Sequence, residues 1–248
     1  MSANSASAQP AITDLESLSR RAGQSIRHPL ARTLLVLTFT TGMVDAVSYL
    51  GIGHVFTANM TGNIVFLGFG LAGSGGLPVV APLISLAAFL VGAGGGGVLA
   101  RRLASRHPRH LAWALALEVA LITAAGVIAA TTHVHANAVS GDTVIALLAL
   151  AMSVRNATAR RLAIPDLTTT VLTMTLTGLA ADSRLFGGTG AGSTRRTVAV
   201  LAMLAGALAG ALLLKRSIVL PLAAAAALAL VTLLVYVPVA RRGTLTPS

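Results

Sequence analysis

Two polar runs interrupt an otherwise strongly apolar chain. The first occupies residues 56–63 and reads Phe-Thr-Ala-Asn-Met-Thr-Gly-Asn, and the second occupies residues 167–175 and carries five threonines. Each run borders apolar stretches of the kind that cross a lipid bilayer. Amides and hydroxyls at membrane depth are costly unless they are paired or solvated, so they mark a pathway or a binding site. One such run in each half of the chain is typical of a duplicated transport protein.

The composition places the chain in a membrane. Only 10% of its residues are charged, against about 25% in soluble domains, and 55% are hydrophobic. Apolar segments recur along the sequence, at roughly residues 33–53, 56–73, 78–100, 111–131, 143–163, 167–181, 197–215 and 218–239. We therefore expect an all-α integral membrane protein that has the lipid bilayer as its surroundings.

Segment length divides these apolar segments into two kinds. A spanning helix needs about 20 apolar residues, and six of the segments reach or approach that length. The second and sixth do not, because their first halves are the polar runs. The prediction is six transmembrane helices together with two short re-entrant or broken helices.

The positions of the basic residues favour six crossings over eight. With six, fifteen Lys and Arg residues share one side of the membrane, Lys215 and Arg216 lie opposite, and Arg155 lies within the bilayer. With eight crossings, one side would carry eight basic residues and the other nine, so the distribution of charge would not indicate an orientation. Because positive charge concentrates in cytoplasmic loops, we expect a multi-pass protein of the bacterial cytoplasmic (inner) membrane with both termini cytoplasmic.

The two halves of the chain resemble each other. The pattern Gly-x-x-x-Gly-x, then an apolar triplet and a basic pair, occupies residues 92–102 and recurs without a gap at residues 206–216. A half that crosses the membrane three times begins and ends on opposite sides, so a second copy of it starts from the opposite side and is inverted. The two repeats would then be related by a two-fold axis in the membrane plane. We favour inversion because it explains the basic pair at 215–216 on the opposite side. A parallel repeat with eight crossings is the alternative.

The predicted organisation follows from these boundaries. It comprises a polar cytoplasmic tail at 1–31, a first membrane repeat at 32–131, an outer loop at 132–142, a second membrane repeat at 143–240 and a cytoplasmic tail at 241–248. Glycine-rich faces in the third and seventh apolar segments allow helices to approach closely, and they are candidates for a homodimer contact.

Several function classes are excluded or disfavoured by what the chain lacks. It has no Cys, which excludes disulfides, thiolate catalysis and iron–sulfur clusters. The basic residues behind the net charge of +11 form short clusters between apolar segments, without interleaved aromatics, so we expect no nucleic-acid partner. No Walker loop, Gly-x-Ser-x-Gly or His-Glu-x-x-His motif is present. We expect no catalytic residues, no cofactor and no metal site.

The sequence around the first polar run resembles a known family signature. Residues 42–50, Gly-x-Val-Asp-Ala-x-Ser-Tyr-Leu, and residues 55–63, Val-Phe-Thr-Ala-Asn-Met-Thr-Gly-Asn, resemble the YoaK-like family of bacterial membrane proteins, the domain of unknown function 1275. Residues 155–161 and 166–173 fit as well, and the resemblance covers roughly residues 33–240. Arg155 departs from the family pattern, where Gln is frequent, and so does Met174, where Gly often follows Thr. The resemblance implies a six-helix membrane protein and no established substrate.

Two charged residues lie near the predicted mid-depth of the membrane. Asp45 is about twelve residues into the first apolar segment, and Arg155 is about twelve residues into the fifth. An unpaired charge there costs at least roughly 2–3 kcal/mol, so we expect the two to pair or to face a common hydrated cavity. A static ion pair that holds the halves together and a substrate or proton site are both open. We expect Glu118 to snorkel towards Arg109 rather than to accept protons.

The polar runs supply neutral groups to the same depth. The first half offers amides, a hydroxyl and an approachable backbone at Asn59, Thr61, Gly62 and Asn63. The second half offers hydroxyls at Thr169, Thr170, Thr173 and Thr175, and an amide beside Arg155 at Asn156. A half-helix that begins near Thr61 would aim its N-terminal N–H groups at mid-depth. Interhelical hydrogen bonds that only hold the bundle together are the alternative.

These features favour a small-solute or ion transporter whose solute the sequence does not name. Its substrate-binding residues would be the neutral groups of the polar runs together with Asp45, Arg155 and Asn156. The alternative is a non-transporting membrane scaffold or regulatory protein. Transport requires the two runs to converge on one cavity, whereas a scaffold leaves each run dry and bonded to its neighbouring helix.

Overall fold

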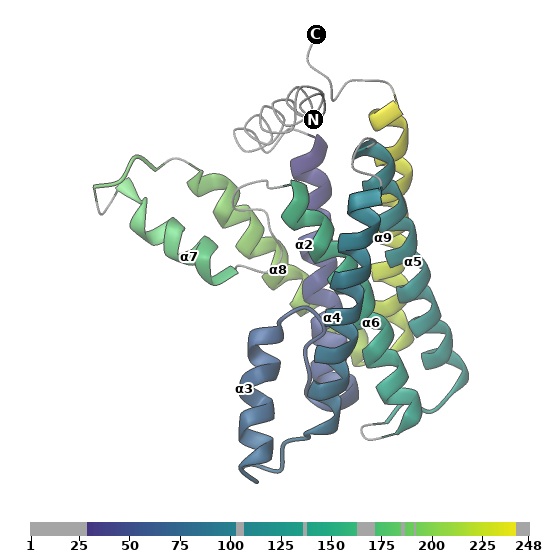
Figure 1. Ribbon diagram of the computed structural model, residues 1–248. Helices are drawn as coiled ribbons and strands as arrows, with labels where there is room; N and C mark the ends of the chain where they lie inside the picture. The colour runs from purple at the N-terminus through teal and green to yellow at the C-terminus, as the bar shows by residue number, and fades with distance from the viewer. Residues whose placement is uncertain are drawn as a thin grey trace, which may run out of the picture.

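The described part of the chain is built from α-helices and one short π-helix. The computed structural model describes residues 29–102, 107–135, 138–162, 172–184, 187–190 and 192–241. Its helices are α2 (Pro29–Val47), η1 (Ser48–Gly53), α3 (Met60–Leu71), α4 (Val80–Arg102), α5 (His107–Thr131), α6 (Val139–Leu162), α7 (Leu172–Ala181), α8 (Ser193–Leu214) and α9 (Val219–Arg241) (Figure 1). No strand occurs in those ranges, so the all-α prediction is confirmed for them.

Five of the described helical spans are long and apolar enough to cross a membrane. They are α2 together with η1, α4, α5, α6 and α8. Helix α9 has 23 residues and begins with the apolar stretch Val219–Val235. With 12 and 10 residues, α3 and α7 fall well below the roughly 20 residues of a spanning helix. The two helices associated with the polar runs are therefore the short ones.

The first polar run is divided between a non-helical segment and a helix. Helix η1 ends at Gly53, and His54 then takes a left-handed backbone conformation with φ of 51°. The chain stays non-helical through residues 55–59 and enters α3 at Met60, one residue before the predicted start. The side chain of Asn59 accepts a hydrogen bond from the Gly62 N–H (3.4 Å) and so caps this helix.

Glycine allows α8 to lie directly against α2. A Cβ atom at Gly206 would collide with the carbonyl oxygen of Phe39, and one at Gly210 would lie 2.7 Å from the carbonyl oxygen of Met43. From the other side, a Cβ at Gly42 would collide with the backbone of Met203. The two backbones therefore touch along a face that only glycine leaves open.

The second Gly-x-x-x-Gly motif joins α4 to α6 in the same way. A Cβ at Gly92 would collide with the hydroxyl of Ser153, and one at Gly96 would lie 3.0 Å from the Cβ of Ala157. Gly94 and Gly95, on other faces of α4, have open space beside them. The glycines of both motifs are thus used for contacts within the chain.

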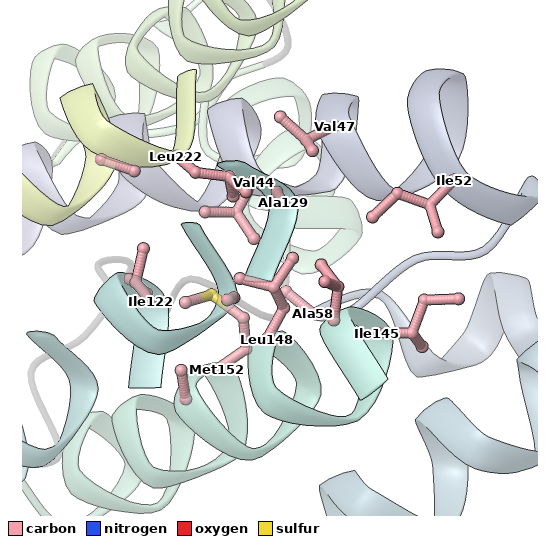
Figure 2. Close-up of a cluster of buried hydrophobic side chains, with 14 of the residues drawn as sticks. Val44, Val47, Ile52, Ala58, Ile122, Ala129, Ile145, Leu148, Met152 and Leu222 are labelled. Carbon is pink, nitrogen blue, oxygen red and sulfur yellow. The ribbon is translucent and has the colours of Figure 1, made fainter. Parts of the chain in front are cut away.

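The apolar core lies where α2, α5, α6 and α9 meet. Helix α5 packs along α6 and α9, and α9 also packs against α2. Figure 2 shows the side chains that fill this space, among them Val44, Val47, Ile122, Leu148, Met152 and Leu222. Large apolar side chains also point outwards, such as Leu90 of α4, Leu204 of α8 and Leu234 of α9. A bundle that is apolar both inside and outside suits a lipid surrounding.

The α2–α8 contact predicts an unequal effect of two glycine substitutions. We expect Gly206→Ala to destabilise the folded protein by about 1–3 kcal/mol, because the added methyl group has no space beside the Phe39 carbonyl. Gly95→Ala is the matched control, since it brings the same gain in helix propensity into open space. Thermal unfolding of both purified variants in detergent measures the difference. Equal unfolding midpoints for the two variants would contradict the tight α2–α8 contact.

Candidate functional site

The carboxylate of Asp45 holds the non-helical segment against the last turn of α2. Its Oδ1 atom accepts three hydrogen bonds, from the Thr57 N–H (2.9 Å), the Thr57 hydroxyl (3.1 Å) and the Ala58 N–H (3.0 Å). Asp45 is only 5% exposed. Backbone N–H groups that re-enter an apolar bundle need acceptors, and this one oxygen supplies them.

Asn63 ties the same segment to α3 and α4. Its Oδ1 accepts from the Phe56 N–H (2.8 Å), and its Nδ2 donates to the Phe56 carbonyl (2.7 Å) and to the Ser85 hydroxyl (3.1 Å). The Ser85 hydroxyl also donates to the Phe56 carbonyl (2.7 Å). Asn63 and Ser85 are fully buried, so this part of the first polar run is dry and structural.

A cavity of about 530 Å³ lies beside Asp45. Asp45 and Tyr49 of the first apolar segment form part of its wall, together with Asn59 at the start of α3. Thr173 of α7 lies on the wall as well, and Met203, Ala207 and Ala211 of α8 complete the apolar side. Residues of both polar runs therefore border one space.

Arg155 lies in a different polar cluster from Asp45. Its Nε atom donates to Glu118 Oε2 (3.0 Å), and Nη2 donates to Glu118 Oε1. Nη1 donates to the Thr41 hydroxyl (2.6 Å) and to the Leu37 carbonyl, and Nη2 donates to the Thr40 hydroxyl (2.8 Å). Arg155 and Glu118 are both buried, and a bidentate pair with further polar partners is the arrangement that makes two buried charges tolerable.

Two predictions about the charged residues are wrong. Asp45 and Arg155 do not form an ion pair with each other, because each finds nearer partners on other elements, and Arg155 is not among the residues that line the cavity beside Asp45. Glu118 does not snorkel towards Arg109 but points inward to Arg155. The i, i+4 spacing of Thr41 and Asp45 places both on one face of α2, which is the one signal that links the two clusters in the sequence.

The remaining predicted residues fall into three groups. Thr61 is exposed on α3, and Gly62 packs closely against the Phe56 ring, so neither lines the cavity. Thr175 is buried on α7, and Asn156 is half-buried beside Arg155. Thr169 and Thr170 lie outside the described residues. Of the predicted substrate-binding residues, the cavity wall contains Asp45, Asn59 and Thr173.

The predictions from the sequence did not include the aromatic side chains that line the cavity. The rings of Tyr49 and Phe56 stack with their centroids 4.9 Å apart and their planes 19° apart, and both residues line the space. The ring of Phe66 of α3 lies 6.0 Å from that of Phe56 and 5.9 Å from that of Tyr49, so the three rings form one cluster. Tyr49 belongs to the π-helical end of the first span. Single π-helical turns of this kind are frequent at functional sites.

The buried Arg155–Glu118 pair predicts a non-additive mutant cycle. Removing one partner by Glu118→Ala leaves a buried guanidinium without its counter-charge, so we expect a loss of about 3–5 kcal/mol in unfolding free energy. The double variant with Arg155→Met should recover part of that loss. Asp182→Ala, which breaks the pair with Arg196 at its exposed carboxylate end, is the control and should cost less than about 1 kcal/mol. Denaturation of the detergent-solubilised proteins measures the cycle, and additive losses would contradict the pairing.

Comparison with known proteins identifies the family. The family model described as "Protein of unknown function (DUF1275)" matches residues 33–235, a range that contains the Asp45 site and the Arg155 cluster. The UPF0700 transmembrane protein YoaK of Bacillus subtilis (strain 168) is 35% identical over 157 residues, which are 62% of this chain and 68% of that protein. No solved structure matches significantly. The resemblance predicted from the sequence is confirmed, and this multi-pass membrane protein belongs to the DUF1275 family.

Proposed function

We propose that the chain is a small-solute or ion transporter of the bacterial cytoplasmic membrane, with the cavity beside Asp45 as its solute site. One observation carries this proposal: a space of about 530 Å³ is bordered by Asp45 and Asn59 from the first half and by Thr173 from the second. That volume lies in the range of small-molecule sites. A non-transporting scaffold has no need of polar groups from both halves around one cavity.

The helix contacts support two inverted halves, α2–α5 and α6–α9. Helix α8 packs on α2 as α4 packs on α6, and α7 lies on α8 as α3 lies on α4. Helices α5 and α9, which are equivalent in the two halves, pack against each other. Each of these contacts thus has its counterpart when the two halves are exchanged, which is what a two-fold relation between repeats requires.

The direction of the first helix in each half supports inversion rather than a parallel repeat. Ile145, near the start of α6, lies beside Gly53 at the end of the first span. Arg155, near the end of α6, bonds to Leu37 in the first half of α2. Helices α2 and α6 therefore run antiparallel (Figure 1).

The same geometry supports six crossings with both termini cytoplasmic. Leu214 at the end of α8 lies against Gly51 of η1, so Lys215 and Arg216 follow at the η1 end of the bundle. The basic pair that ends α4 lies at the other end, because Gly96 near the end of α4 contacts Ala157 near the end of α6. Helices α3 and α7 would then enter the membrane without crossing it, as re-entrant segments.

The absence of a catalytic motif from the sequence supports a protein that is not an enzyme and needs no cofactor. A homodimer, if one forms through a glycine-rich face, would use Gly94 and Gly95, because the other motif glycines are occupied within the chain. The buried hydrogen bonds of Asn63 and Ser85 support a purely structural role for these two residues, which is the role that the scaffold alternative assigns to the whole polar run.

Obstruction of the cavity should abolish transport. Proteoliposomes containing the purified chain would be tested for uptake of labelled solutes of each charge class: a polyol, a carboxylate, a quaternary ammonium and rubidium. Ala211→Trp fills the cavity wall and should reduce uptake to that of protein-free liposomes. Leu212→Trp, on the outward side of the same helix where Leu212 is 52% exposed, should leave it unchanged.

The control separates obstruction from misfolding, because both variants introduce Trp at adjacent positions of α8. Equal uptake by the wild type and Ala211→Trp would place the pathway elsewhere. If no solute class enters the proteoliposomes faster than it enters protein-free liposomes, the result would support the scaffold alternative instead.

A further inference from the structure

We propose that the cavity beside Asp45 binds a small organic cation, an ammonium group carrying methyl or short alkyl substituents. The carboxylate of Asp45 would provide the counter-charge, and the rings of Tyr49 and Phe56 would provide an apolar, electron-rich wall. The inference deepens the proposed function and rests on it for its physiological use, whereas the binding itself can be measured without transport.

The charge of the cavity wall selects for cations. Asp45 is the one charged residue among the described residues that line the space. The buried guanidinium of Arg155 lies in a separate cluster and is already bonded to Glu118, Thr40, Thr41 and the Leu37 carbonyl. A cationic group in the cavity would therefore meet a carboxylate that forms no salt bridge with an arginine or lysine of the described residues, and an anion would meet no cationic side chain on the described wall.

The hydrogen-bond geometry leaves half of the Asp45 carboxylate available. All three hydrogen bonds that Asp45 accepts within the described structure end on Oδ1, and Oδ2 accepts none of them. The donors belong to Thr57 and Ala58, so they fix the orientation of the side chain beside the cavity that Ala58 also lines. A positioned carboxylate oxygen without a donor is the group that an ammonium would approach.

The aromatic side chains favour an ammonium with alkyl groups. Tyr49 and Phe56 line the cavity in a stacked arrangement, and the Phe66 ring packs against both of them. Aromatic faces attract cations within about 6 Å of the ring centroid, and quaternary ammonium ligands are the usual occupants of such sites. Two rings next to one carboxylate are therefore a suitable receptor for a soft organic cation.

The rest of the lining argues against a bare metal ion. Hard cations take about six or more oxygen ligands at short range. Besides Asp45, the side-chain oxygens of the described wall belong to Tyr49, Asn59 and Thr173, and the remaining wall is Gly, Ala, Leu, Met and Phe. Alkyl groups gain from contact with such a wall, whereas a metal ion would lose its hydration shell without replacement.

Equilibrium binding of tritiated choline to the purified, detergent-solubilised full chain tests the inference. We expect saturable binding that tetramethylammonium displaces, and that sodium chloride and dimethylbutanol, the neutral carbon isostere of choline, do not displace at equal concentration. Asp45→Asn keeps an oxygen for the Thr57 and Ala58 donors and should weaken choline binding about tenfold or more, because it removes the counter-charge in a desolvated site.

Two further pairs of variants keep the test decisive if Asp45→Asn does not fold. Tyr49→Leu should weaken choline binding about three- to tenfold, while Tyr49→Phe, which retains the ring, should not. Thr173→Lys places a cation on the cavity wall and should abolish binding, while Thr173→Gln should not. Each pair changes one property at one position, so a general loss of structure would affect both members.

The outcomes separate this inference from the transport proposal. Three results would overturn the organic-cation site. Dimethylbutanol would displace choline as strongly as tetramethylammonium does, sodium would displace choline, or Thr173→Lys would bind choline as the wild type does. Protein-dependent uptake of the polyol or the carboxylate without any choline binding would also overturn it and leave transport standing. Choline binding with the predicted variant effects, but without uptake of any solute, would support the site and refute the transporter.

Discussion

The structure depends on how one carboxylate satisfies backbone donors inside an apolar bundle. The chain leaves its first helix, turns through η1 and re-enters beside α2 without helical hydrogen bonds. In a low-dielectric surrounding, each unpaired N–H group in that segment would cost several kcal/mol. Oδ1 of Asp45 accepts from two of those N–H groups and from the Thr57 hydroxyl. This bonding places Ala58 and Asn59 at the cavity and sets the start of α3.

The glycine motifs decide how the two halves fit together. In each half, the Gly-x-x-x-Gly face belongs to the third apolar segment, yet it packs on the first helix of the other half. Such an exchange means that neither half completes its contacts alone. Close backbone contact is available only where no Cβ intervenes, and small residues are the usual means of helix association where lipid surrounds the helices. The cavity beside Asp45 lies along the same α2–α8 contact, with Ala207 and Ala211 opposite the carboxylate's helix.

The two polar clusters of the bundle have different characters. The Arg155–Glu118 pair is fully bonded, because the guanidinium donates to Glu118 of α5 and to two hydroxyls and a carbonyl of α2. It connects α2, α5 and α6 and has little free space around it. The Asp45 cluster is open on one side, where the carboxylate meets a cavity bordered by aromatic rings. Buried charges that are fully paired serve the fold, whereas a carboxylate beside a cavity can also serve a ligand.

The amino-acid sequence by itself determined the class of protein, its family and the elements that differ from ordinary spans. Apolar length and the polar runs predict long helices and two short ones, because the bilayer sets the length a helix needs and tolerates few unpaired amides. The polar runs, together with the position of Asp45 in the first apolar segment, also predict Asp45, Asn59 and Thr173 as site residues. Only the tertiary structure decided which charges meet. The partner of Arg155 is Glu118, 37 residues earlier on another helix, and no periodicity along one chain reveals which faces of two helices touch. The aromatic wall of Tyr49 and Phe56 likewise exists only because a π-helical turn and a non-helical segment bring the two rings together.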